Sequence, residues 1–303
     1  MGRAIALCTL LLVSLPPSSP QLCLISTLAG TTTSTAPSDG LGTSATFGPG
    51  GSFGSGPQDL ALTASGAALI ADTGAHQIRF LSTSNALSTL AGSGSDGELD
   101  ATGAAAKFSN PAGVAVSPTS GTAYVADMGG HALRAVTPAG VVTTLAGCGH
   151  QALTDGLGTA ACFSSPRGLA LNDASSLLYV ADTANNAVRC VALGSLPVTV
   201  TRLAGAGAQG QVDGVGAAAY FYAPRGVAVL AGVVYVADTG NHAVRRVVVA
   251  TGEVSTVAGG GADPGILFFV ALAGVLSCEA TLAARPALGA EMVAPLAGPR
   301  PEP

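Results

Sequence analysis

The sequence predicts an all-β protein assembled from four-stranded antiparallel sheets that repeat along the chain. A polar motif recurs four times at a nearly constant interval, and short apolar segments separated by glycine-rich turns surround each copy. Of the 303 residues, 42 are glycine and only 10% are charged, which is far from the composition of a disordered polyelectrolyte. A fixed interval between copies indicates a repeat architecture in which each copy is one supersecondary unit.

The repeat is clearest around a motif that reads YVADTGNHAVR in its fourth copy, Tyr235–Arg245. The aspartates of the four copies are Asp72, Asp127, Asp182 and Asp238, so the successive steps are 55, 55 and 56 residues. Three further series keep the same phase: Thr-Leu-Ala-Gly or a close variant at 27–30, 89–92, 144–147, 202–205 and 256–259, Asp-Gly at Asp39, Asp96, Asp155 and Asp213, and Pro-x-Gly at Pro111, Pro166 and Pro224. Agreement of four series at one period excludes a compositional accident.

Each copy reads as four strands. In the second copy we expect strands over 113–116, 123–127, 132–137 and 141–145, with turns over 128–131 and 138–140. A long glycine-rich loop then leads to the next copy and carries a phenylalanine just before its end. These residues, expected to plug the space between neighbouring sheets, are Phe108, Phe163 and Phe221, with Phe47 or Phe53 in the first copy.

Short sheets with apolar side chains on both faces cannot bury themselves alone. Each needs a neighbour on both sides, and a ring of twisted four-stranded sheets meets that need. Helical solenoids are excluded because no apolar period of 3.6 residues runs through the copies. We therefore predict a β-propeller of four-stranded antiparallel blades, with four clear repeats.

The motif over Tyr235–Arg245 resembles the NHL repeat, and the other three copies are similar to it. The resemblance covers about residues 26–259. It implies a β-propeller domain, commonly six-bladed in this family, which we place at residues 24–259. This chain departs from the six-bladed form, because it shows four repeats and one candidate remnant. Residues 24–28 match the fourth strand of a blade, and residues 265–276 could supply inner strands, which gives a degenerate fifth blade. The alternative is an incomplete arc with two exposed apolar sheet faces.

The two ends differ in composition from the repeats. Residues 1–20 combine Arg3, an uncharged stretch and a proline-rich break, which predicts a secretory signal peptide. In the tail, residues 260–303, the segment Pro264–Cys278 is apolar and uncharged. It fits a short membrane anchor, a blade remnant or a sequence unrelated to the domain. The expected location is secreted, endomembrane or cell surface.

Cysteine usage is compatible with export. Cys148 and Cys162 flank one loop and could form a disulfide in an oxidising compartment, or remain two buried thiols. There is no Cys-x-x-Cys pair, and neither a metal nor another cofactor is expected.

The polar residues that recur in every copy read as structural. Three histidines occupy one motif position, but equivalent positions in different blades lie too far apart to share a metal ion. We expect them to stabilise turns, and we expect the aspartate and arginine of each copy to make a diagonal contact within its hairpin. The positions are Asp72, His76 and Arg79; Asp127, His131 and Arg134; Asp182, Asn186 and Arg189; and Asp238, His242 and Arg245.

Function is expected where the copies differ. At the start of the inner strand they read Gln58-Asp59, Ala112-Gly113, Arg167-Gly168 and Arg225-Gly226. Arg167 and Arg225, on adjacent blades, could bind a carboxylate or phosphate through their planar guanidinium groups, with Gln58 and Asp59 nearby. The alternative is a pair of solvated arginines at the rim.

These observations favour an exported, non-enzymatic binding scaffold that presents one face to a protein, a peptide or another polymer, as the resemblance implies. Membrane attachment would use Pro264–Cys278. Nucleic acid is disfavoured by the net charge of −5 and a single lysine. The alternative is a metal-dependent propeller enzyme resembling gluconolactonase-like hydrolases or the peptidyl-hydroxyglycine amidating lyase. It is disfavoured because glycine, alanine and valine prevail on the inner strands.

Overall fold

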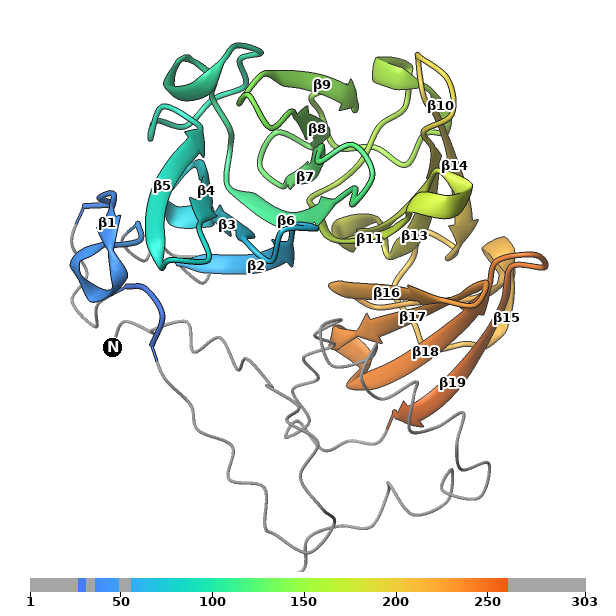
Figure 1. Ribbon diagram of the computed structural model, residues 1–303. Helices are drawn as coiled ribbons and strands as arrows, with labels where there is room; N and C mark the ends of the chain where they lie inside the picture. Colours follow the sequence, from blue (N-terminus) through green and yellow to red (C-terminus); the bar gives the residue numbers. More distant parts are fainter. Residues whose placement is uncertain (1–26, 31–35, 49–55, 261–303) are drawn as a thin grey trace, which may run out of the picture. The chain divides into compact units, whose positions relative to one another are not determined.

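Four antiparallel sheets follow one another along the chain (Figure 1). The computed structural model describes residues 27–30, 36–48 and 56–260. All of these belong to the first of the two units into which the chain divides, Met1–Phe268. The expected all-β fold of four-stranded blades is confirmed, and we number the blades 1 to 4 in chain order.

The strands of each blade run from the inner to the outer edge in sequence order. Blade 1 contains β2 (Pro57–Leu62), β3 (Ala68–Asp72), β4 (Gln77–Leu81) and β5 (Ala86–Ala91). Blade 2 contains β6 (Pro111–Val116), β7 (Ala123–Asp127), β8 (Ala132–Val136) and β9 (Val142–Ala146). Blade 3 contains β11 (Pro166–Asn172), β12 (Leu177–Asp182), β13 (Ala187–Ala192) and β14 (Thr199–Ala204). Blade 4 contains β16 (Gly226–Leu230), β17 (Val233–Asp238), β18 (Ala243–Val248) and β19 (Glu253–Gly259).

The glycine-rich loops do more than connect the blades. Each loop adds a short strand beside the outermost strand of the blade that follows it in the chain, namely β1 (Gly40–Leu41), β10 (Gly156–Leu157) and β15 (Gly214–Val215). In blade 2 a single bridge between Thr102 and Val141 takes that place. The loop therefore pairs with the backbone groups at the exposed edge of the sheet, which protects the edge from pairing with another chain. The sequence pattern did not reveal these strands.

Short 3-10 helices complete the connections. Those in the interblade loops are η1 (Gly42–Ser44), η3 (Gly103–Ala105), η4 (Gly158–Ala160) and η7 (Gly216–Ala218). Those in the hairpins are η2 (Thr73–Ala75), η5 (Asp173–Ser175), η6 (Thr183–Asn185) and η8 (Thr239–Asn241). The strand boundaries expected from the sequence shift slightly, since the inner strand of blade 2 begins at Pro111 and its outer strand ends at Ala146.

Apolar clusters between consecutive blades form the core. One cluster joins blades 1 and 2, another joins blades 2 and 3, and another joins blades 3 and 4. Phe108, Phe163 and Phe221 each sit in one of these clusters and are fully buried, as expected for plugs between sheets. Phe47 packs partly buried against blade 1, whereas Phe53 lies outside the described residues.

The histidine position of the motif joins neighbouring blades. His76, His131, Asn186 and His242 all adopt the left-handed backbone conformation, with φ between 48° and 54°. The side chains of the first three accept hydrogen bonds from the backbone N–H of Asn110, Ser165 and Ala223, at 3.1, 3.0 and 2.9 Å. Each of these donors lies in the loop just before the next blade. The side chains of His76, His131 and Asn186 therefore bind a distant loop, whereas the sequence had predicted that this position stabilises its own turn.

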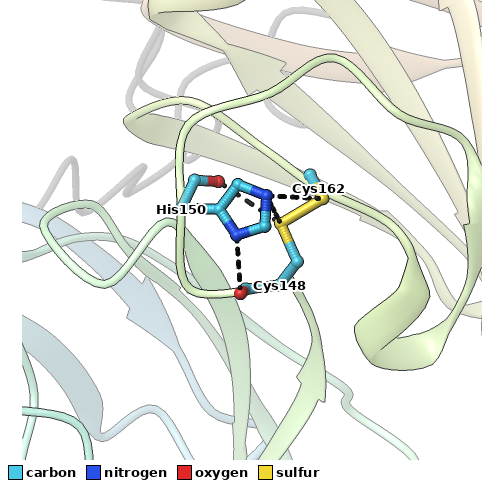
Figure 2. A group of neighbouring side chains, drawn as sticks. All are labelled: Cys148, His150 and Cys162. Atoms are coloured by element: carbon cyan, nitrogen blue, oxygen red, sulfur yellow. Dashed lines mark hydrogen bonds between the residues drawn. A yellow bond between two sulfur atoms is a disulfide. The ribbon is translucent and has the colours of Figure 1, made fainter.

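A disulfide between Cys148 and Cys162 closes the loop that leads into blade 3 (Figure 2). Their Cα atoms are 4.9 Å apart. Cys148 is half-buried and Cys162 is buried in the core cluster region before Phe163.

Several sequence predictions concern residues outside the described part of the chain: the signal segment 1–20, the tail 261–303 with Pro264–Cys278, and most of 24–28. Thr27 and Leu28 are described, and neither belongs to a strand. Within the described ranges, no helix has both the length and the apolar character needed to cross a bilayer.

Replacing the plug Phe163 should destabilise the protein strongly. Phe163→Ala removes a fully buried ring and leaves a cavity, so we expect a loss of about 3–5 kcal/mol in the free energy of unfolding, measured by urea denaturation. Leu196→Ala, at a side chain that is 83% exposed, is the matched control and should change it by less than about 0.5 kcal/mol. A similar loss in both variants would contradict the assignment of Phe163 as a plug.

Candidate functional site

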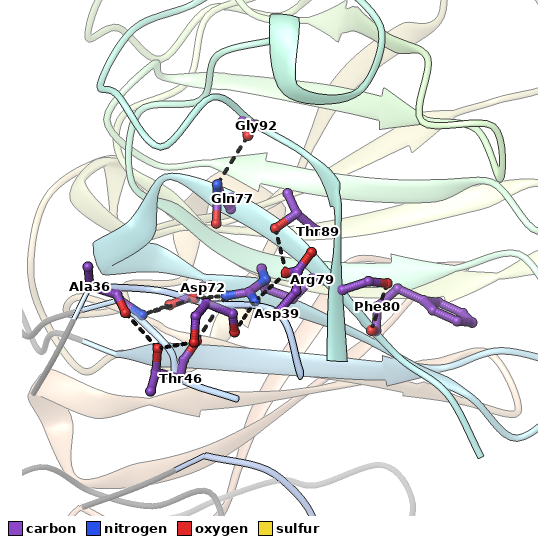
Figure 3. A network of polar contacts seen from close by, with 12 residues as sticks. Ala36, Asp39, Thr46, Asp72, Gln77, Arg79, Phe80, Thr89 and Gly92 are labelled. Atoms are coloured by element: carbon purple, nitrogen blue, oxygen red, sulfur yellow. Dashed lines mark hydrogen bonds and ion pairs between the residues drawn. The ribbon is translucent and has the colours of Figure 1, made fainter. Parts of the chain in front are cut away.

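Every blade contains one buried arginine that binds several acceptors. Figure 3 shows the contacts of this arginine in blade 1. The Nη1 atom of Arg79 contacts the motif aspartate Asp72 at 3.1 Å, and its Nη2 atom contacts Asp39 of the preceding loop at 2.8 Å. The guanidinium lies over the ring of Phe47, 5.9 Å from its centroid. Arg79 and Asp72 are both fully buried, so this group is part of the interior.

The other blades repeat the arrangement closely. The arginine contacts the motif aspartate at 3.0, 2.9 and 2.9 Å in the pairs Arg134–Asp127, Arg189–Asp182 and Arg245–Asp238. It contacts the loop aspartate at 2.6, 2.7 and 2.7 Å in the pairs Arg134–Asp100, Arg189–Asp155 and Arg245–Asp213. The plug phenylalanine lies below each guanidinium at 5.1–5.3 Å from the ring centroid.

In every blade the pairing register between the third and fourth strands shifts just before the buried arginine. The shift falls between Ile78 and Arg79, Leu133 and Arg134, Val188 and Arg189, and Val244 and Arg245. Such bulges bend a strand and redirect a side chain. Burial raises the pKa of the motif aspartates, while the paired arginine and backbone N–H donors oppose that rise. Because the group recurs four times with the same contacts, we interpret it as structural rather than catalytic.

Sequence reasoning missed part of this network. It treated the Asp-Gly loops as turns, whereas their aspartates bind the arginines. In blade 2 the binding aspartate is Asp100 and not Asp96 of the Asp-Gly pair. It also overlooked Asn185 and Asn241, which donate to the motif aspartates of their blades, both at 2.8 Å. Their place three residues after the motif aspartate was the available signal.

The variable positions of the inner strands converge. The strands β2, β6, β11 and β16 pack beside one another in that order. Arg167 of blade 3 donates from Nη1 to Oε1 of Gln58 in blade 1 at 3.0 Å, across 109 residues of sequence. The backbone N–H of Gly168 donates to the carbonyl oxygen of Arg225 in blade 4 at 2.8 Å. A Cβ atom at Gly168 would collide with that carbonyl, so this close approach requires glycine.

The two arginines of this group carry uncompensated positive charge. Burial, and secondarily the charge of Arg225, lower the pKa of Arg167. Neither Arg167 nor Arg225 forms an ion pair with any of the described residues. The Nε atom of Arg167 is buried and has no hydrogen-bond partner in the described part of the chain. Arg167, whose guanidinium is partly desolvated and has no acidic partner among the described residues, can bind an anion with little competition from water.

Asp59 makes no ion pair with these arginines among the described residues. Its carboxylate accepts hydrogen bonds from the backbone N–H of Val114 in blade 2, at 3.0 Å, and of Leu60, at 2.9 Å. Burial raises the pKa of Asp59 to about 6, against the effect of these two donors. The described structure therefore unites Gln58, Arg167 and Arg225 into one group and places Asp59 at the junction between blades 1 and 2.

The histidines of the motif do not form a cluster that could bind a metal ion among the described residues. They lie in separate blades, and among the described residues the one group of His, Cys, Asp and Glu close enough to share a metal ion is Cys148, His150 and Cys162.

Repeated four-stranded blades with converging inner strands define this protein as a β-propeller of tandem repeats. A family model for the NHL repeat matches residues 221–247. NHL repeat-containing protein 2 of Homo sapiens is 36% identical over 106 residues, and that of Bos taurus is 35% identical over 106 residues. Residues 221–247 therefore match an NHL repeat, and part of the chain is similar to NHL repeat-containing proteins.

The extent of these similarities is limited. The matched segment covers 34% of this chain and 15% of each curated relative, so this chain corresponds to a small part of those proteins. A crystal structure of an auxiliary nutrient binding protein from Bacteroides ovatus ATCC 8483 superimposes with a TM-score of 0.51 at 18% identity. The superposition covers 68% of this chain and 48% of that protein, and it supports the fold.

Removing a central arginine should cost more than removing a surface arginine. Arg189→Met leaves Asp182 and the loop aspartate without their cation, so we expect a loss of about 3–5 kcal/mol in unfolding free energy, measured by urea denaturation. Arg246→Met, at an exposed position one residue after the equivalent arginine of blade 4, is the control and should stay within about 0.5 kcal/mol of the parent. Equal effects of the two changes would argue against the structural role.

Asp59 should make stability depend on pH. Its pKa in the folded protein, about 6, exceeds that of an exposed aspartate, about 3.9, so the folded state binds more protons between these values. Stability from this group is therefore present below about pH 4, is lost as pH rises to about 6, and changes little above that. The loss amounts to at most about 3 kcal/mol.

The measurement compares urea unfolding of the parent and Asp59→Asn at several pH values. The parent should lose stability relative to the variant between about pH 4 and pH 6. A difference that is constant over this range would refute the raised pKa.

Proposed function

We propose that this chain is an exported NHL-repeat propeller that acts as a non-enzymatic binding scaffold for an anionic protein or peptide segment. The observation that carries the proposal is the group of Gln58, Arg167 and Arg225, which combines two neighbouring guanidinium groups without an ion-pair partner among the described residues. The ligand group would be a carboxylate or another planar anion, because a guanidinium binds such groups through paired hydrogen bonds.

The position of the group supports this role. The buried Asp–Arg–Phe contacts are alike in all four blades and account for stability, whereas the inner-strand residues differ between blades. Gln58 already holds Arg167 in place through one Nη1 hydrogen bond, which reduces the side-chain entropy that ligand binding would cost. Arg225 is exposed and can meet an incoming ligand. A protein with the same fold is described as an auxiliary nutrient binding protein, which is consistent with ligand binding by such a scaffold.

Two observations support export. Residues 1–20 have the composition of a signal peptide, and the Cys148–Cys162 disulfide suits an oxidising compartment. The alternative to secretion is attachment to a membrane through Pro264–Cys278. Secretion is tested by fusing residues 1–25 to a reporter and measuring its appearance in the medium.

Ligand binding is tested with the full chain and an array of short acidic peptides, each paired with its amidated, neutral counterpart. The parent should bind acidic peptides, with an affinity that falls as salt concentration rises. Arg167→Gln and Arg225→Gln should each weaken binding by at least about tenfold, because each removes a charge-assisted hydrogen bond. Arg246→Gln is the matched control, since it removes one exposed arginine from blade 4 but leaves the inner strands intact.

The outcomes separate the alternatives. Equal binding of acidic and neutral peptides, or equal loss in Arg167→Gln and Arg246→Gln, would refute anion recognition by the inner strands. Turnover of a peptide or lactone substrate that requires a bound divalent metal would replace the scaffold proposal by an enzymatic one.

A further inference from the structure

The loop closed by the disulfide contains a histidine that the repeat does not require. Cys148 and His150 flank Gly149 in the loop after blade 2, and Cys162 directly precedes the plug Phe163. The equivalent residues after blades 1 and 3 are Ser93, Ser95 and Lys107, and Ala206, Ala208 and Tyr220. These three residues therefore occur together once, whereas the fold is built identically in the other blades without them.

The imidazole of His150 is oriented toward both sulfur atoms (Figure 2). Its Nε2 atom lies 3.6 Å from Sγ of Cys148 and 4.0 Å from Sγ of Cys162. Its Nδ1 atom lies 3.2 Å from the carbonyl oxygen of Cys148, a distance at which Nδ1–H donates to that oxygen. This tautomer leaves the lone pair of Nε2 free and directed at the sulfurs. A backbone carbonyl that accepts from the other ring nitrogen is the usual support of a histidine that binds a metal.

The distances suit a tetrahedral zinc ion. With Zn–S of about 2.3 Å and Zn–N of about 2.0–2.1 Å, two ligand atoms on a tetrahedral ion lie about 3.6 Å apart for S and N, and about 3.8 Å apart for two S atoms. The two S–N separations already lie near that value. Only the two sulfurs would have to separate, and that requires the disulfide to be broken.

We propose that Cys148, His150 and Cys162 form a redox-gated zinc site: closed and metal-free as the disulfide, and open to one Zn²⁺ when the two cysteines are reduced. A dithiol reductant supplies two electrons and two protons, breaks the S–S bond and leaves as its own disulfide. The two thiols then lose their protons as their thiolates bind Zn²⁺, and His150 binds through Nε2 without losing a proton. Because His150 is exposed, a water molecule can fill the fourth position.

This inference does not rest on the proposed scaffold function, because the site lies in the loop and not on the inner strands. It does bear on location: the disulfide form belongs to an oxidising compartment and the zinc form to a reducing one.

The test uses the full chain with Cys8, Cys23, Cys190 and Cys278 changed to serine, so that no other thiol binds metal. Zinc affinity is measured by competition with a chromophoric chelator, before and after reduction. The reduced chain should bind one Zn²⁺ and release about two protons per ion near pH 7, because free thiols with pKa of about 8.5 are mostly protonated there. The oxidised chain should bind none. Co²⁺ in place of Zn²⁺ should give the thiolate charge-transfer and visible bands of a tetrahedral site.

Two variants separate the three-ligand site from binding by thiols alone. His150→Ala should weaken zinc binding by more than the 10–100-fold that the loss of an outer partner costs. His242→Ala is the matched control, because this half-buried turn histidine has no side-chain hydrogen bond among the described residues and lies in another blade, so the change should leave zinc affinity unchanged. Circular dichroism of each oxidised variant checks that the fold is intact.

The proposal is overturned if the reduced parent binds Zn²⁺ no more tightly than Cys148→Ser/Cys162→Ser, or if His150→Ala binds as tightly as the parent. If reduction unfolds the chain, recovery of the β-sheet spectrum on adding Zn²⁺ supports the site. Failure to recover it rejects the site. Loss of peptide binding with zinc binding retained, or the reverse, shows which of the two proposals has failed.

Discussion

Every blade depends on one buried arginine. Arg189 shows the full set of contacts: Nη1 donates to Asp182 and to the carbonyl oxygen of Cys162, and Nη2 donates to Asp155 and to the carbonyl oxygen of Thr154. One side chain thus connects the hairpin of blade 3 with two points of the loop that precedes it, one at residues 154–155 and one at Cys162. A lysine has a single ammonium group and cannot hold four acceptors in one plane, whereas the guanidinium fork can. The Phe163 ring under the guanidinium offsets part of the cost of burying its charge.

This anchoring determines where the inner strand begins, and hence the geometry of the candidate site. The loop carbonyl bound by Arg189 belongs to the residue before the plug, and the inner strand β11 starts at Pro166, three residues after Phe163. The side chain of His131 fixes Ser165 between them. The backbone just before Arg167 is therefore held by two contacts, one from Arg189 of blade 3 and one from His131 of blade 2. Gln58 in turn orients the guanidinium of Arg167, and an oriented arginine can select a ligand group by geometry as well as by charge.

The repeated parts of the fold were predictable from the sequence because their causes recur with them. Aspartate, arginine, phenylalanine and proline keep a constant phase, and a phase that four copies share reveals strands, turns and plugs. The finer contacts were less accessible. Asp100 binds Arg134 from a position that lacks the Asp-Gly signature, and the bridge of His76 to Asn110 spans two blades, which no local turn rule can reveal. The approach of Gln58 to Arg167 depends on how blades 1 and 3 converge, and pairwise patterns within one repeat carry no information on that.

Residues that differ between the copies are not required by the repeated fold, so they indicate a role other than stability. A repeat that needs only to fold can keep small residues on its inner strand, as blade 2 does with Ala112 and Gly113. Blade 3 departs from this twice, with Arg167 on the inner strand and with Cys148, His150 and Cys162 in the loop before it. Both departures are anchored by the same Asp155–Arg189–Asp182 contacts, since the disulfide joins the loop to the residue whose carbonyl Arg189 binds. The disulfide and Arg167 thus lie close together in the sequence, on the segment that leads from the loop into the inner strand β11.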